Sequence, residues 1–314
     1  MAVRQPETKF YPDVPSKVVQ VRHAGVWDGD ELVPNALRQI LDASITELTG
    51  LNDARDAWAA LFAPGEQIAI KVNALGGPCP THPPLVMVVT ECLQEAGVPA
   101  EQIVVFDRYT SELKAVGYTI NRDSPGVRCY GTDESGPAAR SSAASGHYVP
   151  GGKIMDTNVR LSEILMNCHA LINVPILKVA MLREVGMTFA MKNHYGTFDR
   201  PADFHGERFQ RGVAELNALP PIKDRTRLII GDALTAKTHQ GSQAVGAGNA
   251  VLVSFDPVAH DTIGLQMTGE ALVAAGRDPT AATTAASRWL ANGAELGLGT
   301  DDVENIDLVE VKLG

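Results

Sequence analysis

The most varied chemistry in this chain lies in four consecutive residues, Lys192, Asn193, His194 and Tyr195, which bring together a cation, an amide, an imidazole and a phenol. Binding and catalytic groups are often carried by loops of this kind. We expect Lys192 and Lys178 to hold an anion, or to act as a base or an imine-forming amine. We expect His194 or Tyr195 to transfer a proton. The alternative interpretation is a solvated loop with one hydrogen-bonded histidine.

Polar residues also follow several apolar segments that have the character of buried strands. These residues are Lys71, Asn73, Asp107, Asn173, Asp232 and Asp256. In open α/β sheets, ligands bind outside the carboxyl ends of the strands, so these side chains are expected to converge on one cleft. We predict that the substrate is bound by Lys71, Asn73, Thr81, Asn173 and Asn193. A single aspartate at a strand end is also a common helix N-cap, which is the structural alternative.

A bound divalent metal is a second hypothesis, because oxygen and nitrogen donors are numerous. The predicted ligands are the carboxylates of Asp107, Asp232, Asp256 and Asp261. No HExxH motif or other fixed spacing supports this set. The four cysteines include no CxxC pair, so we expect neither an iron–sulfur cluster nor a zinc ribbon. The identity of any cofactor is left open.

Alternating strand and helix patterns predict an α/β protein with a mostly parallel central sheet, covered by helices and carrying loop insertions. Apolar runs predict strands near 18–21, 67–73, 103–107, 170–175, 228–232, 250–254 and 306–311. Helical periodicity predicts helices near 31–48, 85–97, 258–268 and 280–292. We expect one domain over 1–314, with a small subdomain or insertion around 108–165. Gly76 and Gly77 predict a tight turn.

The overall charge limits the kind of partner this chain can bind. The 314 residues are 45% hydrophobic and 20% charged, and the formal net charge is −10. An acidic chain is a poor match for nucleic acid, whose phosphates need a basic surface. The cations Lys178, Arg183 and Lys192 lie close together in sequence and favour a small anionic molecule.

The location of the protein is only partly indicated. No apolar run of about eighteen residues predicts membrane insertion, so we expect a soluble protein. The N-terminal segment lacks the apolar core of a signal peptide. We therefore expect a cytoplasmic protein as the chain is written, or an exported one if a signal has been removed. Homo-oligomer formation is left open.

Several segments taken together resemble domain of unknown function 362. The matching segments are Lys71-Val-Asn73, Thr81-His-Pro83, Leu171-Ile-Asn-Val-Pro175 with Lys178, Lys192-Asn-His-Tyr-Gly196, Glu215-Leu-Asn-Ala-Leu-Pro220, Ile222-Lys-Asp-Arg-Thr-Arg-Leu-Ile-Ile-Gly-Asp232, and Ser254-Phe-Asp-Pro-Val-Ala259 with Asp261. They span most of the chain between about 68 and 264. The resemblance is to the branch whose members often carry a twin-arginine export signal. It implies a fold and a site, but no agreed reaction.

The chain departs from that branch in three respects. It shows no twin-arginine signal, and it lacks the ferredoxin-type cysteine motifs of some members. Members tend to have a histidine shortly after the lysine that matches Lys178, whereas Val179, Ala180 and Met181 stand here. A looser likeness to the N-terminal part of lactate racemases is confined to the proline-rich turn before the helix at Pro84. We carry no nickel chemistry across from that likeness.

These observations predict an enzyme that acts on a small anionic substrate by acid–base or redox chemistry. The substrate would lie in a cleft lined by lysine, asparagine, histidine and aspartate side chains. The competing hypothesis is a non-catalytic subunit that uses the same cleft to bind a cofactor, a metal or a partner.

Overall fold

The computed structural model describes residues 15–75, 79–134, 147–180, 183–238, 241–246 and 248–314. The turn predicted at Gly76 and Gly77 lies outside these residues. Within them, no helix is both long enough and apolar enough to cross a membrane.

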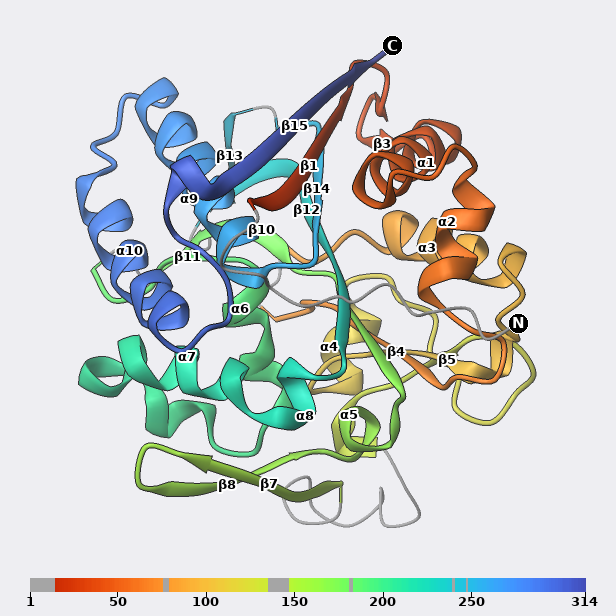
Figure 1. Ribbon diagram of the computed structural model, residues 1–314, viewed down its shortest axis with the longest axis horizontal. Helices are drawn as coiled ribbons and strands as arrows, with labels where there is room; N and C mark the ends of the chain where they lie inside the picture. Colours follow the sequence, from red (N-terminus) through yellow and green to blue (C-terminus); the bar gives the residue numbers. More distant parts are fainter. Residues whose placement is uncertain (1–14, 76–78, 135–146, 181–182, 239–240, 247) are drawn as a thin grey trace.

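A single large sheet runs through the middle of the molecule (Figure 1). Its strand order is β15 (Ile306–Leu313), β1 (Ser16–His23), β14 (Ala250–Ser254), β12 (Thr226–Thr238), β9 (Ala170–Asn173), β4 (Ile68–Lys71), β5 (Ile103–Phe106) and β6 (Arg128–Cys129). The five strands from β12 to β6 run parallel to one another. Only β14 within this order runs antiparallel to the strands beside it. The prediction of an α/β fold with a mostly parallel sheet is confirmed.

The strand predicted at 170–175 is divided by Pro175. Proline has no N–H group to donate to a neighbouring strand, so it interrupts the ladder. β9 ends at Asn173, and β10 (Ile176–Ala180) continues beside the second half of β12. β11 (Gly186–Thr188) then pairs antiparallel with β10, and β13 (Gly241–Gly246) pairs antiparallel with β12. This division places Lys178 on a strand that extends beyond the carboxyl end of β9.

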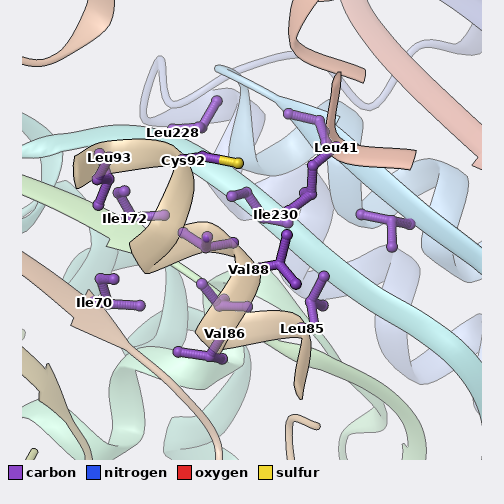
Figure 2. Packing of buried hydrophobic residues seen from close by; sticks show 14 of the residues in the cluster. Leu41, Ile70, Leu85, Val86, Val88, Cys92, Leu93, Ile172, Leu228 and Ile230 are labelled. Carbon is purple, nitrogen blue, oxygen red and sulfur yellow. The ribbon is translucent and has the colours of Figure 1, made fainter. Parts of the chain in front are cut away.

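Three helices cover one face of the sheet, on the right in Figure 1. They are α1 (Pro34–Thr49), α2 (Ala54–Leu61) and α3 (Pro83–Glu95). Figure 2 shows Leu85, Val88 and Cys92 of α3 packed among apolar side chains of the strands and of α1. The first helix begins at Pro34 and not near 31, because β2 (Trp27–Asp28) pairs with β3 (Glu31–Leu32). Proline is favoured in the first helical turn, where its missing N–H has no cost.

The other face carries α6 (Ala190–Asn193), α7 (Phe209–Ala218), α8 (Pro220–Lys223), α9 (Pro257–Ala274) and α10 (Thr280–Glu295). Residues of β14 alternate between the two cores: Val251 and Val253 pack toward α1, whereas Ala250 and Leu252 pack toward α9. This alternation is the ordinary consequence of the strand period. Both faces of the sheet are therefore buried, so any site must lie at its edges or strand ends.

The region around 108–165 contains α4 (Thr110–Ala115), a hairpin and α5 (Glu163–Asn167). The hairpin pairs β7 (Tyr148–Ile154) with β8 (Thr157–Ser162) and lies at the bottom of Figure 1. Ile154 and Leu161 belong to the same apolar cluster as the residues of α7. The hairpin thus packs on the main body, and the division of the chain into a domain with a small insertion stays a prediction. Short 3-10 helices lie at 100–102, 132–134 and 303–305.

Candidate functional site

A cavity of about 360 Å³ lies beyond the carboxyl ends of β4 and β5, and we call it the lysine cavity. Its other walls are β10 and segment 184–209, which holds β11, α6 and the 3-10 helices η3 (His194–Thr197), η4 (Pro201–Phe204) and η5 (Gly206–Arg208). The polar and charged lining residues are Lys71, Asn73, Asp107, Arg108, Tyr109, Glu112, Lys178, Thr188, Lys192, Asn193, Tyr195 and His205. Seven residues singled out from the sequence are among them: Lys71, Asn73, Asp107, Lys178, Lys192, Asn193 and Tyr195.

Lys71 is buried and uses all three of its ammonium hydrogens within the protein. Its Nζ lies 2.7 Å from Asp107 Oδ1. It also donates to the Val72 carbonyl at 2.5 Å and to Asn193 Oδ1 at 3.3 Å. Burial lowers the pKa of Lys71, and the carboxylate of Asp107 opposes that shift. With three acceptors in place, Lys71 has no hydrogen left for a ligand.

Gly196 closes over this ion pair. A Cβ at position 196 would lie 2.3 Å from Asp107 Oδ1 and 2.8 Å from Lys71 Nζ. Only a residue without a side chain lets the backbone come this near. The glycine of the Lys-Asn-His-Tyr-Gly stretch is therefore explained by close packing of segment 184–209 on the ends of β4 and β5.

Lys178 is also held by three acceptors, all from the loop that follows β4. Its Nζ donates to Leu75 O at 2.7 Å, to Asn73 Oδ1 at 3.0 Å and to Cys79 O at 3.3 Å. Burial lowers the pKa of Lys178 to about 8. These bonds fasten the loop to β10, so Lys178 adds positive charge to the cavity without offering a free hydrogen.

Lys192 differs from the other two lysines. Within the described part of the chain, its Nζ has no hydrogen-bond acceptor and no carboxylate partner. It lies over the ring of Tyr195, 3.1 Å from the ring centroid, and 5.4 Å from that of Phe209. Burial lowers the pKa of Lys192 well below its usual range, with Glu184 opposing the shift and two neighbouring lysines adding to it. Desolvation disfavours the charged form of an amine, so it favours the form with a free lone pair.

His205 reaches the same cavity and is oriented by a carboxylate. Its Nδ1 lies 2.6 Å from Glu184 Oε1, which also accepts the Gly206 N–H at 3.1 Å. A carboxylate at Nδ1 requires a hydrogen there, so Nε2 of the neutral ring is an acceptor. The imidazole packs against Tyr195 and Phe209, with ring centroids 5.4 and 5.7 Å apart. His205 and Lys192 thus rest on the same two aromatic rings.

Arg108 and Glu112 complete the ionisable lining. Arg108 donates from Nε to Tyr109 Oη, and from Nη1 and Nη2 to the carbonyls of Phe198 and Asp199. Two of its five N–H groups have no protein acceptor in the described residues. Glu112 Oε2 is buried and lacks a partner there. Burial raises the pKa of Glu112, and the charge of Asp107 adds to this.

Sequence reasoning did not select Arg108, Glu112 or His205 as site residues. Arg108 and Glu112 follow Asp107 by one and five positions, so the strand-end rule could have found them. His205 stands in a polar stretch after Tyr195, but its pairing with Glu184 across 21 positions left no local pattern.

His194 lies on the far side of a hydrogen-bonded wall from the lysine cavity. Asn193 Nδ2 donates to Asn173 Oδ1 at 2.7 Å. The Asn173 amide nitrogen then faces Ala190 O at 2.9 Å and His194 Nε2 at 3.3 Å. Because that nitrogen donates, His194 Nε2 is the acceptor and the proton sits on Nδ1, which has no partner in the described structure. Burial lowers the pKa of His194 to about 3, so the ring is neutral.

His194 and Asn173 line a second cavity of about 620 Å³, together with Asn217 and apolar residues of α8 and of the start of α9. This arrangement is at odds with a proton-transfer role for His194 in the lysine cavity. Tyr195 is likewise committed, because its hydroxyl donates to the Phe204 carbonyl at 2.7 Å. Burial raises the pKa of that hydroxyl. Its ring, and not its hydroxyl, faces Lys192.

Thr81 and Asp232 fasten the loop after β4 and do not line the lysine cavity. Thr81 Oγ1 donates to Val174 O at 2.8 Å and accepts the Asn73 N–H at 2.9 Å. Asp232 Oδ2 accepts the backbone N–H of His82 at 2.8 Å and lies 2.7 Å from His82 Nδ1. Thr81 thus holds the loop against the end of β9, and Asp232 holds it against the middle of β12.

The four carboxylates predicted as metal ligands do not share a centre. Asp107 pairs with Lys71. Asp256 caps α9 through the N–H groups of residues 258 and 259 and also accepts the hydroxyl of Ser16. Asp261 accepts two N–H groups at the start of α6. Among the described residues, no three histidine, cysteine, aspartate or glutamate side chains are grouped as a metal site would need.

The structure of this chain has limited similarity to known structures. The lactate racemase apoprotein from Thermoanaerobacterium thermosaccharolyticum matches with a TM-score of 0.41 and 9% identity, over 83% of this chain and 58% of that one. A protein from Thermotoga maritima matches with a TM-score of 0.37 and 11% identity, over 83% of this chain and 60% of that one. This chain thus spans less than two thirds of either protein.

The sequence comparison is more decisive. No curated protein matches the sequence of this chain. A family model, described as a domain of unknown function (DUF362), matches residues 68–266. This match covers the strands that line the lysine cavity, the whole of segment 184–209 and most of α9. The chain belongs to the DUF362 family.

Proposed function

We propose that this protein is an enzyme that binds a small anionic substrate in the lysine cavity and moves protons there by acid–base chemistry. The observation that carries the proposal is the free amine of Lys192, which has no acceptor in the described structure although Lys71 and Lys178 each have three. Lys192 is half-buried at the edge of the cavity, so its amine is available to a ligand there. Ionisable groups with shifted pKa values are concentrated at functional sites.

Charge and size support an anionic substrate. Lys71 is neutralised by Asp107, which leaves the positive charges of Lys178 and Arg108 at the cavity of a chain whose net charge is −10. A local positive field in an acidic protein concentrates small anions. The volume of about 360 Å³ falls at the small end of the usual range for ligand sites.

The acid and the base are assigned from the environments of the free groups. Burial shifts the pKa of Glu112 upward and that of Lys192 downward, so each moves toward neutral pH. Opposite shifts of this kind let one site hold a protonated acid and an unprotonated base together. We assign Glu112 as the acid, Lys192 and His205 Nε2 as the bases, and Arg108 as the anion-holding group.

Exchange in deuterated water tests this proposal. The full chain is incubated with a panel of small carboxylic acids, and mass spectrometry follows deuterium uptake or conversion of each. We expect turnover of at least one acid, and a fall of about 100-fold or more in His205→Gln and Lys192→Met, the usual contribution of a proton-transferring side chain. Arg108→Gln should weaken binding of the same acid.

One outcome would favour the competing hypothesis, a non-catalytic binding subunit, over an enzyme. If the panel acids bind and Arg108→Gln weakens them, but neither exchange nor conversion occurs, the cavity belongs to a non-catalytic binding subunit. If no small anion binds at all, the proposal fails.

A further inference from the structure

We propose that Lys192 forms a covalent imine with the carbonyl carbon of a small aldehyde or ketone that also carries an anionic group. This inference rests on the proposed function and names the substrate class and the reacting atom. Of the three lysines that line the cavity, Lys192 is the one whose amine is free to react.

Only Lys192 has a nitrogen with no competing acceptor in the described residues. A lysine whose three hydrogens are held by fixed acceptors must break those bonds before its nitrogen can attack a carbon. Lys71 and Lys178 are both in that position. The amine of Lys192 rests on the face of Tyr195 and borders the cavity directly. An amine activated by desolvation and by neighbouring cations is the usual environment of an imine-forming lysine.

Two other ionisable residues that line the cavity, Glu112 and His205, supply the proton transfers that imine formation needs. The nitrogen lone pair forms a C–N bond, and the carbonyl π electrons move to oxygen, which takes a proton from the Glu112 carboxyl. The nitrogen then loses a proton to His205 Nε2. His205 returns its proton to the hydroxyl oxygen, the nitrogen lone pair forms the C=N bond as the C–O bond breaks, and water leaves. The N–H proton of the resulting iminium returns to the Glu112 carboxylate. The net change is amine plus carbonyl to imine plus water, so no oxidant or reductant is required.

The anionic group of the substrate has its own binding partners. Arg108 keeps two N–H groups free in the described structure, and Lys178 adds charge nearby. A guanidinium with two free N–H groups is suited to a carboxylate. The cavity thus offers an amine for the carbonyl and a cation for the acid group, which matches the two functional groups of a 2-oxo acid.

Reductive trapping tests the inference directly. The full chain is treated with glyoxylate or pyruvate and sodium cyanoborohydride at neutral pH, and peptide mass spectrometry locates the reduced adduct. We expect Lys192 to be labelled about 10-fold or more faster than Lys153, an exposed lysine of the β7–β8 hairpin that serves as control in the same sample. Lys192→Arg keeps a long nitrogen-bearing side chain but replaces the amine with a guanidinium, and it should abolish the adduct at this position.

Two further measurements separate this inference from the proposed function. Lactate and propionate carry the anion without a carbonyl, and their stabilisation of the wild type against heat, lost in Arg108→Gln, reports the anion site alone. Anion binding with no preference for Lys192 over Lys153 overturns the imine and leaves the proposed function standing. If neutral acetaldehyde labels Lys192 as fast as glyoxylate does, the amine reacts with carbonyl compounds in general, and the anionic substrate class is overturned. Absence of both binding and labelling overturns both proposals.

Discussion

Two regions of the molecule contribute lysines to one cavity, and they use them differently. The strand ends and the loop after β4 surround Lys71 and Lys178 with fixed acceptors. Segment 184–209 leaves Lys192 on an aromatic surface and orients His205 through Glu184. The difference shows that a buried lysine near a cavity is not by itself reactive, because acceptors within the protein can bind all of its ammonium hydrogens.

The largest expected effect lies in the strand-end region, at Asp107. Asp107→Ala leaves the buried ammonium of Lys71 without its carboxylate, and we expect a loss of about 3–5 kcal/mol in the free energy of unfolding. Urea denaturation measures it. A double variant, Lys71→Met with Asp107→Leu, removes both charges and should regain part of the loss. A loss below about 1 kcal/mol would mean that the pair does not hold this region together.

The contact between the two regions is tested at Gly196. In Gly196→Ala the added methyl group would meet Asp107 and Lys71, which must shift, so we expect a loss of about 1–3 kcal/mol. Gly65→Ala is the matched control, because nothing lies within 4 Å of a Cβ there. If both variants unfold at the same urea concentration, the close approach of segment 184–209 is not a constraint.

The hydrogen-bonded wall formed by Asn193, Asn173 and His194 is tested by the pH dependence of stability. The pKa of His194 is about 3 in the folded protein and 6.5 in the unfolded chain, so the unfolded state binds more protons between these values. Stability present above pH 6.5 is therefore lost as the pH falls toward 3, by at most about 1.4 kcal/mol per pH unit. His194→Gln should show a shallower fall across this window in urea titrations. Equal slopes would show that His194 gains its proton in the folded state.

The smallest expected effect on stability belongs to Lys192. Lys192→Met removes an amine that has no acceptor in the part of the chain that the structure describes, and it keeps the length of the side chain. We therefore expect a change within about 1 kcal/mol in the free energy of unfolding. Lys178→Met is the matched comparison and should lose about 2 kcal/mol or more, since two buried acceptors and the part-buried Leu75 carbonyl lose their donor. Equal losses in the two variants would erase the distinction between the regions.

Much of the fold could be predicted from residue patterns. Apolar runs such as 103–107 and 250–254 correspond to β5 and β14, because a strand buried on both faces needs apolar side chains at every position. The ends were less predictable: Pro175 divides one predicted strand, and the β2–β3 pair delays α1 to Pro34. Strand pairing and backbone interruptions set such boundaries, and the hydrophobic periodicity of a local segment does not show them.

The site was predicted in its location more than in its roles. The rule that parallel strands end at one edge predicts that Lys71, Asn73 and Asp107 lie together, and the structure places all three with Lys178 around one cavity. The expected role of His194 in proton transfer stays a prediction. The structure places His194 at the second cavity and Lys192 at the first, because residues two apart on a helix point in different directions. The direction in which each side chain of a short helix points depends on the segments that pack against it, and these cannot be identified from local sequence.

The sequence by itself determined which chemical groups are present, the strand and helix pattern that carries them, and the strand edge where they gather. Only the tertiary structure decided which of these groups are free. The bond from Lys178 to Asn73 spans 105 positions and that from Lys71 to Asn193 spans 122. Hydrogen bonding and burial, which set both availability and pKa, depend on such distant neighbours and not on residue type. The density of chemistry around Lys192 is therefore a property of the sequence, whereas the lack of an acceptor for its amine among the described residues is a property of the fold.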